Sequence, residues 1–251
     1  MSDYTKINEK VIKEWKDRFN FYWMIPFSHE EFESIKNGAN LLTVTPNKKV
    51  PYEWYSDCKG KKVLGVAAGG GQQMAVFSAL GAQCTLLDIS NEQIESDLLV
   101  SCREGYAIKI VKGDMTEKLP FDDESFDIVI NPISNHYIRD LQPFFDEIYR
   151  VLKKGGIFIA GMQNEIYWAV TPNTNKLEIK LPVDPLADKE LYNDLIRKGY
   201  ALQFSHTTCE QIGCQLKAGF VLKDLYEDTE EGVFGELNIP TSIATCSEKS
   251  I

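Results

Sequence analysis

The chain has 251 residues, of which 43% are apolar, and it carries a formal net charge of −10 at pH 7. That length and apolar content suffice for the core of one larger domain, and no segment reaches the roughly 18 to 20 apolar residues that a membrane-spanning helix needs. Nucleic-acid binding draws on clustered Lys and Arg that neutralise phosphates, and no such run occurs, so duplex DNA or a long RNA is not an expected partner.

The first 60 residues combine an amphipathic helix with an aromatic stretch. Residues 6–21 are predicted to be helical because Ile7, Val11 and Trp15 recur at helical spacing and form one apolar stripe. Core packing is the simplest role for that stripe. The beginning of the chain mixes Lys with Glu and Asp and lacks the apolar run of a signal peptide, so we expect a cytoplasmic protein.

Residues 62–88 form the most informative segment of the chain. A strand over residues 63–66 runs into three glycines at 69–71, then a helix over residues 72–80 and a second strand that ends on Asp88. This is the order of a βαβ half-unit that binds a nucleotide-like ligand at the carboxyl ends of its strands. The helix start offers unpaired N–H groups to an anion, and the acid is placed to accept hydrogen bonds from a ribose.

Two glycine patterns can be laid over this turn. The Gly-x-Gly-x-x-Gly pattern of dinucleotide-binding domains falls on Ala67, Gly69 and Gln72, so its third glycine is missing and an NAD-dependent oxidoreductase is disfavoured. The pattern Gly-x-Gly-x-Gly falls on Ala67, Gly69 and Gly71, with only the first glycine replaced. In this register the segment resembles the cofactor loop of class I S-adenosylmethionine-dependent methyltransferases.

The resemblance covers residues 61–161. Residues 112–130 are similar to that family's third strand ending at an acid, a short loop, and a Phe-Asp pair that opens the fourth strand. Residues 146–161 resemble the helix, Gly-Gly turn and fifth strand of the small-molecule branch, often called type 11 or UbiE-like. The resemblance implies an α/β, Rossmann-like fold with a mostly parallel seven-stranded sheet flanked by helices, as one structural domain whose core spans residues 61–251 after an N-terminal segment, residues 1–60.

The resemblance also implies S-adenosylmethionine as the cofactor. The glycine turn would hold its methionine end, Asp88 its ribose hydroxyls and Asp114 its adenine, and Asn131 would lie beside the reacting sulfonium. The family usually has an acid where this chain has Gly65, which leaves the methionine ammonium to backbone carbonyls or to Asn131. The residues expected to bind the cofactor are Ala67, Ala68, Gly69, Gly71, Gln72, Asp88, Ile89, Asp114, Met115 and Asn131.

Two additions to the core are expected from the same resemblance. Segments before the first strand commonly cover the cofactor in this family, so residues 1–60 are expected to form a lid, with static packing as the alternative. Acceptor-recognition segments often follow the fifth strand, and residues 163–206 are expected to be such an insertion. The core then resumes with a helix over residues 208–218 and strands near residues 220–226 and 242–246.

The acceptor site is expected around the loop NPISNHYI, which follows the fourth strand. His136 in this loop is the first candidate for a general base, with pocket lining as the alternative. His206 is the second candidate, although its neighbours are placed to cap the next helix. The Asn-Pro pair is half of the Asn-Pro-Pro-Tyr motif of amino-group methyltransferases, which leaves nitrogen open as the attacked atom. Aromatic faces suit a sulfonium or a flat acceptor, and those expected at the pocket are Tyr22, Trp23, Tyr137 and Trp168.

No metal site is predicted, because the six cysteines form no Cys-x-x-Cys pair and have no His at zinc spacing. The acidic run at residues 227–231 is expected to be a solvated loop or strand end, with attraction of cationic substrates as the alternative. The leading function is a methyltransferase acting on a small molecule. The alternatives are a methyltransferase acting on a tRNA base or a protein side chain, for which a basic rim is missing, and a non-catalytic cofactor-binding protein. The oligomeric state is left open.

Overall fold

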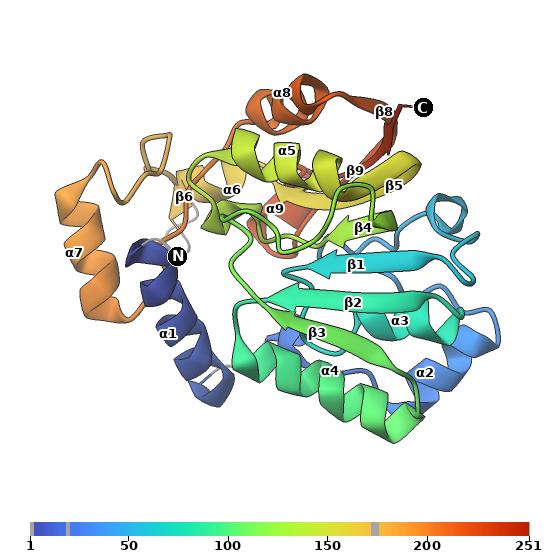
Figure 1. The fold of residues 1–251 in the computed structure, drawn as a ribbon. Helices are drawn as coiled ribbons and strands as arrows, with labels where there is room; N and C mark the ends of the chain where they lie inside the picture. The colour runs from blue at the N-terminus through green and yellow to red at the C-terminus, as the bar shows by residue number, and fades with distance from the viewer. Residues whose placement is uncertain (1–2, 19–20, 172–175, 251) are drawn as a thin grey trace.

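The fold, seen in a computed structural model that describes residues 3–18, 21–171 and 176–250, is a sheet between two layers of helices (Figure 1). The seven strands follow the order β3-β2-β1-β4-β5-β9-β8. The first five pair in parallel, and β9 runs antiparallel to both of its neighbours. The predicted mostly parallel seven-stranded sheet is therefore confirmed. Its strands are β1 (Lys62–Val66), β2 (Gln83–Asp88), β3 (Ile108–Lys112), β4 (Phe126–Asn131), β5 (Leu152–Gln163), β8 (Phe220–Asp228) and β9 (Ser242–Lys249).

Helices cover both faces of this sheet (Figure 1). One apolar core joins the sheet to α2, α3 and α4, and a second joins it to α5 and α8. Burial on both faces explains why the central strands are continuous apolar runs rather than alternating ones. The helices are α1 (Asp3–Arg18), α2 (His29–Lys36), α3 (Gln73–Ala79), α4 (Asn91–Glu104), α5 (Leu141–Val151), α6 (Ile166–Ala169), α7 (Lys189–Lys198), α8 (Thr208–Ala218) and α9 (Val233–Glu236), with short 3-10 turns η1 (Tyr22–Met24), η2 (Tyr52–Trp54) and η3 (Asn135–Tyr137).

The helix α1 spans Asp3–Arg18 where residues 6–21 were predicted, of which residues 19–20 lie outside the described part. It packs against the chain that follows α7. Asn8 donates from Nδ2 to the carbonyl of Leu202 at 2.9 Å and accepts the Leu202 N–H at 2.7 Å. Val11 and Trp15 of the predicted stripe are buried in a small core with Ala201. The packing role of this stripe is confirmed, while its movement as a lid stays a prediction. Figure 1 shows α1 and α7 beyond the carboxyl ends of the parallel strands.

The segment between β5 and α8 contains α6, α7 and a two-stranded hairpin of β6 (Val170–Thr171) and β7 (Lys176–Leu177). This is the stretch predicted as an insertion at residues 163–206, of which residues 172–175 lie outside the described part. No helix of the described residues is both long and apolar enough to cross a membrane.

The chain reverses its direction of sheet growth between β1 and β4. Such a switch point opens a crevice outside the carboxyl ends of the two strands. A loop before β1 closes one side of the crevice, because the carbonyl of Val44 accepts the Ile133 N–H at 3.1 Å. Gly161 of β5 makes this approach possible, since a Cβ there would lie 1.8 Å from the Val44 carbonyl oxygen.

Candidate active site

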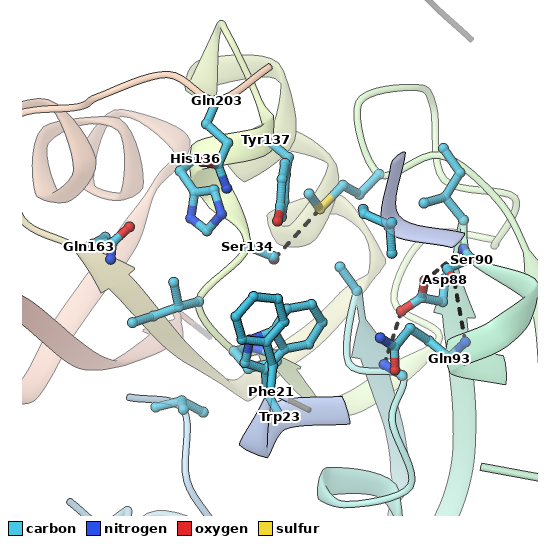
Figure 2. Close-up of a pocket in the computed structure, with 18 of the residues that line it drawn as sticks. Phe21, Trp23, Asp88, Ser90, Gln93, Ser134, His136, Tyr137, Gln163 and Gln203 are labelled. Atoms are coloured by element: carbon cyan, nitrogen blue, oxygen red, sulfur yellow. Dashed lines mark hydrogen bonds between the residues drawn. The ribbon is translucent and has the colours of Figure 1, made fainter. Parts of the chain in front are cut away.

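A cavity of about 920 Å³ occupies this crevice. It extends from the carboxyl ends of β1, β2 and β3 to α1, η3 and the segment after β5. In Figure 2, Asp88 and Gln93 lie on one side of it, and His136 and Tyr137 lie on another. The predicted site residues that line the cavity are Tyr22, Trp23, Ala67, Gly69, Gln72, Asp88, Ile89, Asp114, Met115, His136, Tyr137 and Trp168.

The turn between β1 and α3 has its amide donors occupied by the protein itself. The Gly69 N–H donates to Asp88 Oδ2 at 3.0 Å. The Gly70 and Gly71 N–H groups both donate to Asp97 Oδ2, at 2.9 and 3.0 Å. These three N–H groups are therefore not free for a ligand, and the predicted role of the N–H groups at the start of the following helix stays a prediction. The acceptors of these hydrogen bonds are side-chain carboxyl groups of the same chain, those of Asp88 and Asp97.

The shape of the turn explains which glycines it needs. Ala67, at the first glycine position of the pattern, adopts a left-handed backbone with φ +47°, which an alanine tolerates at a cost of about 1 to 2 kcal/mol. Gly69 has no room for a side chain, because a Cβ would lie 2.6 Å from the Cβ of Gln93. Gly70 has φ +129°, and a Cβ there would lie 2.6 Å from the Trp23 carbonyl oxygen.

Asp97, which holds this turn, was not predicted. It lies in α4 with no exposed surface, and its second oxygen, Oδ1, has no partner among the described residues. Burial raises the pKa of this carboxyl group to about 7, although the two glycine N–H groups act in the opposite direction. A sequence signal was available. Ile94, Asp97 and Val100 share one face of the helix by their spacing, so the acid falls on the buried stripe.

Asp88 ends β2 and lines the cavity while its two oxygens fix the surrounding backbone. Oδ1 accepts the Ser90 N–H at 2.9 Å, and Oδ2 accepts the Gly69 N–H. Burial raises the pKa of Asp88 to about 6 against these hydrogen bonds. Each carboxylate oxygen retains an acceptor site. The group can therefore still accept a hydroxyl donor from the cavity.

Asp114 follows β3 by two residues and presents an unused acceptor. Its Oδ1 accepts the N–H of Thr116 at 2.9 Å and the hydroxyl of the same residue at 2.8 Å. Its Oδ2 is buried and has no partner among the described residues. Met115 lies beside it, with the Ser134 hydroxyl 3.8 Å from its sulfur. An acceptor left unpaired in this position favours a ligand that carries an N–H donor.

Four predicted site residues do not line the cavity. Ala68 and Gly71 are buried in the packing of the turn. Asn131 donates from Nδ2 to the Val66 carbonyl at 2.8 Å and to the Ser134 hydroxyl at 2.7 Å, so it supports the strand end. His206 lies behind the wall, where Nε2 is 2.7 Å from the Ile138 carbonyl oxygen and Nδ1 is 3.2 Å from Glu210. The polar groups of Asn131 and His206 are thus bonded to other parts of the protein. Neither residue contacts the cavity in this structure.

The far end of the cavity holds His136, Tyr137 and Trp168. The His136 ring lies 4.2 Å from the Tyr137 ring and 5.8 Å from the Trp168 ring, measured between centroids. Burial, followed by the nearby His206, lowers the pKa of His136 to about 3, so its imidazole is neutral at physiological pH. His136 Nδ1 and Trp168 Nε1 are buried and have no partner among the described residues. Two polar atoms thus lack a partner, of which the indole N–H is a donor, while the tautomer of the neutral imidazole sets whether Nδ1 donates or accepts.

The N-terminal segment reaches over the glycine turn. Gln72 donates from Nε2 to the carbonyls of Tyr22, at 2.8 Å, and Ile25, at 2.7 Å. The Phe27 N–H donates to the Gly71 carbonyl at 3.2 Å. Gln72 therefore lines the cavity and also ties the segment before β1 to the turn.

Several lining residues were missed by the sequence reasoning. Gln163 was within reach of it, because it ends β5 at the same edge of the sheet as the predicted residues. Residues 43–47 belong to a loop whose place over the sheet is set by tertiary contacts. The other missed residues that line the cavity include Gln93, Gln203, Glu230 and Glu231.

Comparison with known proteins assigns the family. Residues 64–160 match the family described as "Methyltransferase domain". The chain is 37% identical over 235 residues to "Uncharacterized methyltransferase YbaJ" of Bacillus subtilis, and the alignment covers 90% of this chain and 91% of that protein. This chain belongs to the class I S-adenosylmethionine-dependent methyltransferases. The predicted family and cofactor, S-adenosylmethionine, are confirmed.

Two further comparisons concern the fold and a part of the sequence of this methyltransferase. A crystal structure of an S-adenosylmethionine-dependent methyltransferase from Mesorhizobium loti superposes with a TM-score of 0.62 at 17% identity, covering 85% of this chain and 99% of that one. It shows a shared fold. A 108-residue stretch is 37% identical to "Probable phthiotriol/phenolphthiotriol dimycocerosates methyltransferase 2" of Mycobacterium ulcerans, covering 41% of this chain and 40% of that protein.

An acid in place of Gly65 in β1, where the family usually has one, would require the Met74 side chain to move. A Cβ on Gly65 would lie 2.7 Å from Met74 Cε and 3.0 Å from Ala68 Cβ. Of the two alternatives for the methionine ammonium, which needs an acceptor oxygen, Asn131 does not line the cavity, whereas Ala67 and Gly69 bring backbone to its wall.

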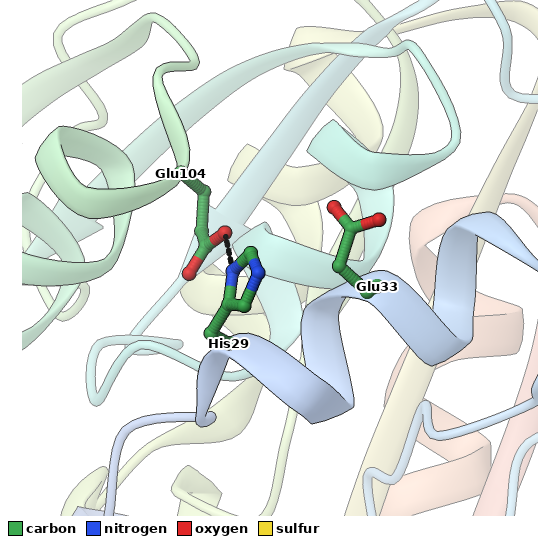
Figure 3. Close-up of side chains that lie close together, drawn as sticks. All are labelled: His29, Glu33 and Glu104. Atoms are coloured by element: carbon green, nitrogen blue, oxygen red, sulfur yellow. Dashed lines mark hydrogen bonds and ion pairs between the residues drawn. The ribbon is translucent and has the colours of Figure 1, made fainter.

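One surface group of the described residues has metal-ligand chemistry. His29, Glu33 and Glu104 bring their ligand atoms within 4.8 Å of one another on α2 and α4 (Figure 3). None of them lines the cavity. Glu33 is already 2.7 Å from the ammonium of Lys36, and Glu104 pairs with Arg103 and with His29. The group is therefore an ion-pair network at the surface, with the Glu104 side chain largely buried in it, and it lies apart from the cavity.

Proposed function

We propose that this methyltransferase transfers a methyl group to a small molecule enclosed in the cavity. The observation that carries the proposal is that one continuous cavity reaches both the predicted cofactor residues and the predicted acceptor residues. One cavity of about 920 Å³ touches Asp88 and Asp114 at one end and His136 and Trp168 at the other. A pocket of this size can hold a cofactor together with a compact acceptor.

The chain's own residues fit the cofactor at three points. Asp88 retains acceptor sites for the ribose hydroxyls, and the unpaired Oδ2 of Asp114 suits the amino group of adenine. Gly69 and Ala67 let backbone form the wall where the methionine end would lie. S-adenosylmethionine, when bound, supplies an activated methyl group, so the tasks left to the protein are alignment and exclusion of water.

Residues 1–60 would act as the lid over this site. Gln72 is bonded to two carbonyls of the N-terminal segment, and α1 contributes Ile12 and Trp15 to the cavity wall. Exchange of the cofactor requires these contacts to open, because they cross the glycine turn. The closed arrangement excludes water from the reacting atoms.

Asp88→Ala should weaken binding of S-adenosylhomocysteine by about 10-fold or more, because a buried ribose hydrogen bond is worth about 1 to 3 kcal/mol. Isothermal titration calorimetry at one pH measures this change. Asp122→Ala, which removes an exposed acid outside the cavity, is the control and should bind like the wild type. Unchanged affinity in Asp88→Ala, or tight binding of NAD by the wild type, would contradict the assignment.

His136→Asn should lower kcat by about 10- to 100-fold with little change in cofactor affinity, if Nδ1 accepts a proton from the acceptor. The loss should shrink as pH rises, because the acceptor then ionises unaided. The pKa of His136 is about 3, so the neutral imidazole persists and this residue should cause no activity loss in the wild type between pH 5 and pH 9. A test reaction first requires a methyl acceptor, which a screen of pooled metabolites with labelled cofactor would supply.

His29→Asn is the matched control for this measurement, since that histidine is exposed and lies outside the cavity. A rise in the KM for the acceptor at constant kcat would show that His136 is a pocket wall. Full activity of His136→Asn across the pH range would remove it from the mechanism.

A further inference from the structure

The charges on the cavity wall all have one sign. Among the described residues that line it, the side chains charged at neutral pH are the four acids Asp88, Asp114, Glu230 and Glu231, and no Lys or Arg is present. Around its acids, a wall whose described side chains include no cation disfavours anionic groups and favours neutral or cationic ones. The first two acids lie at the cofactor end, which leaves the two glutamates without an assigned role.

Glu230 is fixed in place by its backbone and by its neighbour. Its N–H donates to the Thr241 hydroxyl at 3.0 Å. The buried carboxylate of Asp228 accepts the N–H groups of Asn47 and Lys48, both at 2.8 Å, which anchors the strand end to the loop before β1. The predicted solvated character of this acidic run is therefore wrong at Asp228. Glu230, two residues after Asp228, therefore lines the cavity from a segment that these hydrogen bonds hold in place.

The Glu230 carboxylate has no cationic partner in the described part of the chain. It is half-buried, and burial, followed by the charge of Asp228, raises its pKa. Burial raises the pKa of the Tyr167 phenol, and the negative charge of Glu230 is the second cause of that increase. Tyr22 and Tyr167 both line the cavity. A carboxylate beside aromatic rings is the combination that binds organic ammonium groups.

We propose that the methyl acceptor carries an ammonium group on an aromatic or apolar body, with Glu230 as the residue that recognises the ammonium. The inference rests on the proposed function, because it assigns a substrate class to the same cavity. The body of the acceptor lies among Trp15, Trp23 and Trp168, which line the cavity. Glu230 is a recognition residue here, and the methylated atom is a separate position near His136.

The test uses matched probes that differ only in charge. Wild-type protein saturated with S-adenosylhomocysteine is titrated by calorimetry with tryptamine and indole-3-propionate, and then with phenethylamine and 3-phenylpropionate. Each amine should bind about 10-fold more tightly than its carboxylate partner, since a hydrogen bond to a charged group is worth about 1.5 to 3 kcal/mol. Glu230→Gln should clearly reduce that preference, leaving only the part that the other acids of the wall provide.

Glu227→Gln removes the same charge from an exposed position outside the cavity and should keep the preference of the wild type. Thermal melting verifies that both variants fold. Equal or tighter binding of the carboxylates, no amine binding, or an unchanged preference in Glu230→Gln would overturn the inference. Binding of S-adenosylhomocysteine, measured first, verifies that the cofactor site is intact. Transfer of labelled methyl from the cofactor to a small molecule tests the proposed function separately, so that function can hold while the amine preference fails.

Discussion

Asp97→Ala is expected to lower the free energy of unfolding by about 2 to 5 kcal/mol. The substitution leaves the N–H groups of Gly70 and Gly71 buried without an acceptor, and each such loss costs about 1 to 3 kcal/mol. Urea denaturation at pH 6 measures the change. Because the same N–H groups shape the turn at the cofactor end of the cavity, binding of S-adenosylhomocysteine should weaken in parallel.

Asp97→Asn separates the geometry of this contact from its charge. The amide oxygen can accept both glycine N–H groups, so this variant should lose less stability than Asp97→Ala and retain more cofactor affinity. Its pH dependence carries a defined sign. The pKa of Asp97 is raised to about 7 in the folded protein, so the stability that its proton provides is complete below the unfolded value of about 3.9 and is lost as pH rises through 7.

Between about pH 4 and pH 7, the free energy of unfolding of the wild type should therefore fall relative to that of Asp97→Asn. Above about pH 7 the difference between the two proteins should level off. Taking the difference cancels other titrating groups. His136, whose pKa is lowered, acts with the opposite sign in that range. A difference that is constant with pH, or stability of Asp97→Ala equal to wild type, would show that Asp97 does not hold the turn as a buried acid.

Gly161→Ala is expected to destabilise the protein by more than about 3 kcal/mol. The added Cβ would lie 1.8 Å from the Val44 carbonyl oxygen, so the loop before β1 must move off the sheet. That movement breaks the hydrogen bond from the Ile133 N–H and displaces Val44 from the cavity wall. Cofactor affinity should fall together with stability, because both depend on the closed crevice.

Gly213→Ala provides a matched control for the glycine substitution. Gly213 lies inside α8, and a Cβ there meets no atom within 4 Å. Alanine in a helix interior is favoured over glycine by about 0.5 to 1 kcal/mol, so this variant should be slightly more stable than wild type. Thermal or urea unfolding of the two variants compares them directly. Gly161→Ala within 1 kcal/mol of wild type would mean that the loop approaches β5 less closely than described.

Buried acids thus do two different tasks in this site. Asp97 holds the glycine turn from beneath and does not line the cavity, while Asp88 holds the same turn and also lines the cavity. Removal of either should affect cofactor binding, but only Asp97→Ala removes the support of Gly70 and Gly71. Comparison of the Asn and Ala variants at each position distinguishes lost ligand contact from a collapsed turn.

Local sequence determined the Rossmann-like core and the cofactor end of the site. Strand, turn and helix in residues 62–88 follow from short-range patterns, and the parallel connection brings Asp88, Asp114 and His136 to one edge of the sheet. These residues were predictable because each ends a strand or follows one by a few positions. The sheet converts sequence order into spatial proximity by a general rule, so no knowledge of long-range contacts was required.

Tertiary structure alone decided which side chains remain available to a ligand. Asn131 and His206 have the right chemistry, yet their polar atoms are engaged by Val66 and Ile138, far from them in sequence. Asp97 reaches the glycine turn only because α4 packs beneath it. Glu230 likewise lines the cavity because the fold brings the segment after β8 to it. A side chain can form hydrogen bonds to a ligand only where packing leaves some of its donor or acceptor sites unused by the protein. Packing is set by the whole chain rather than by any local pattern.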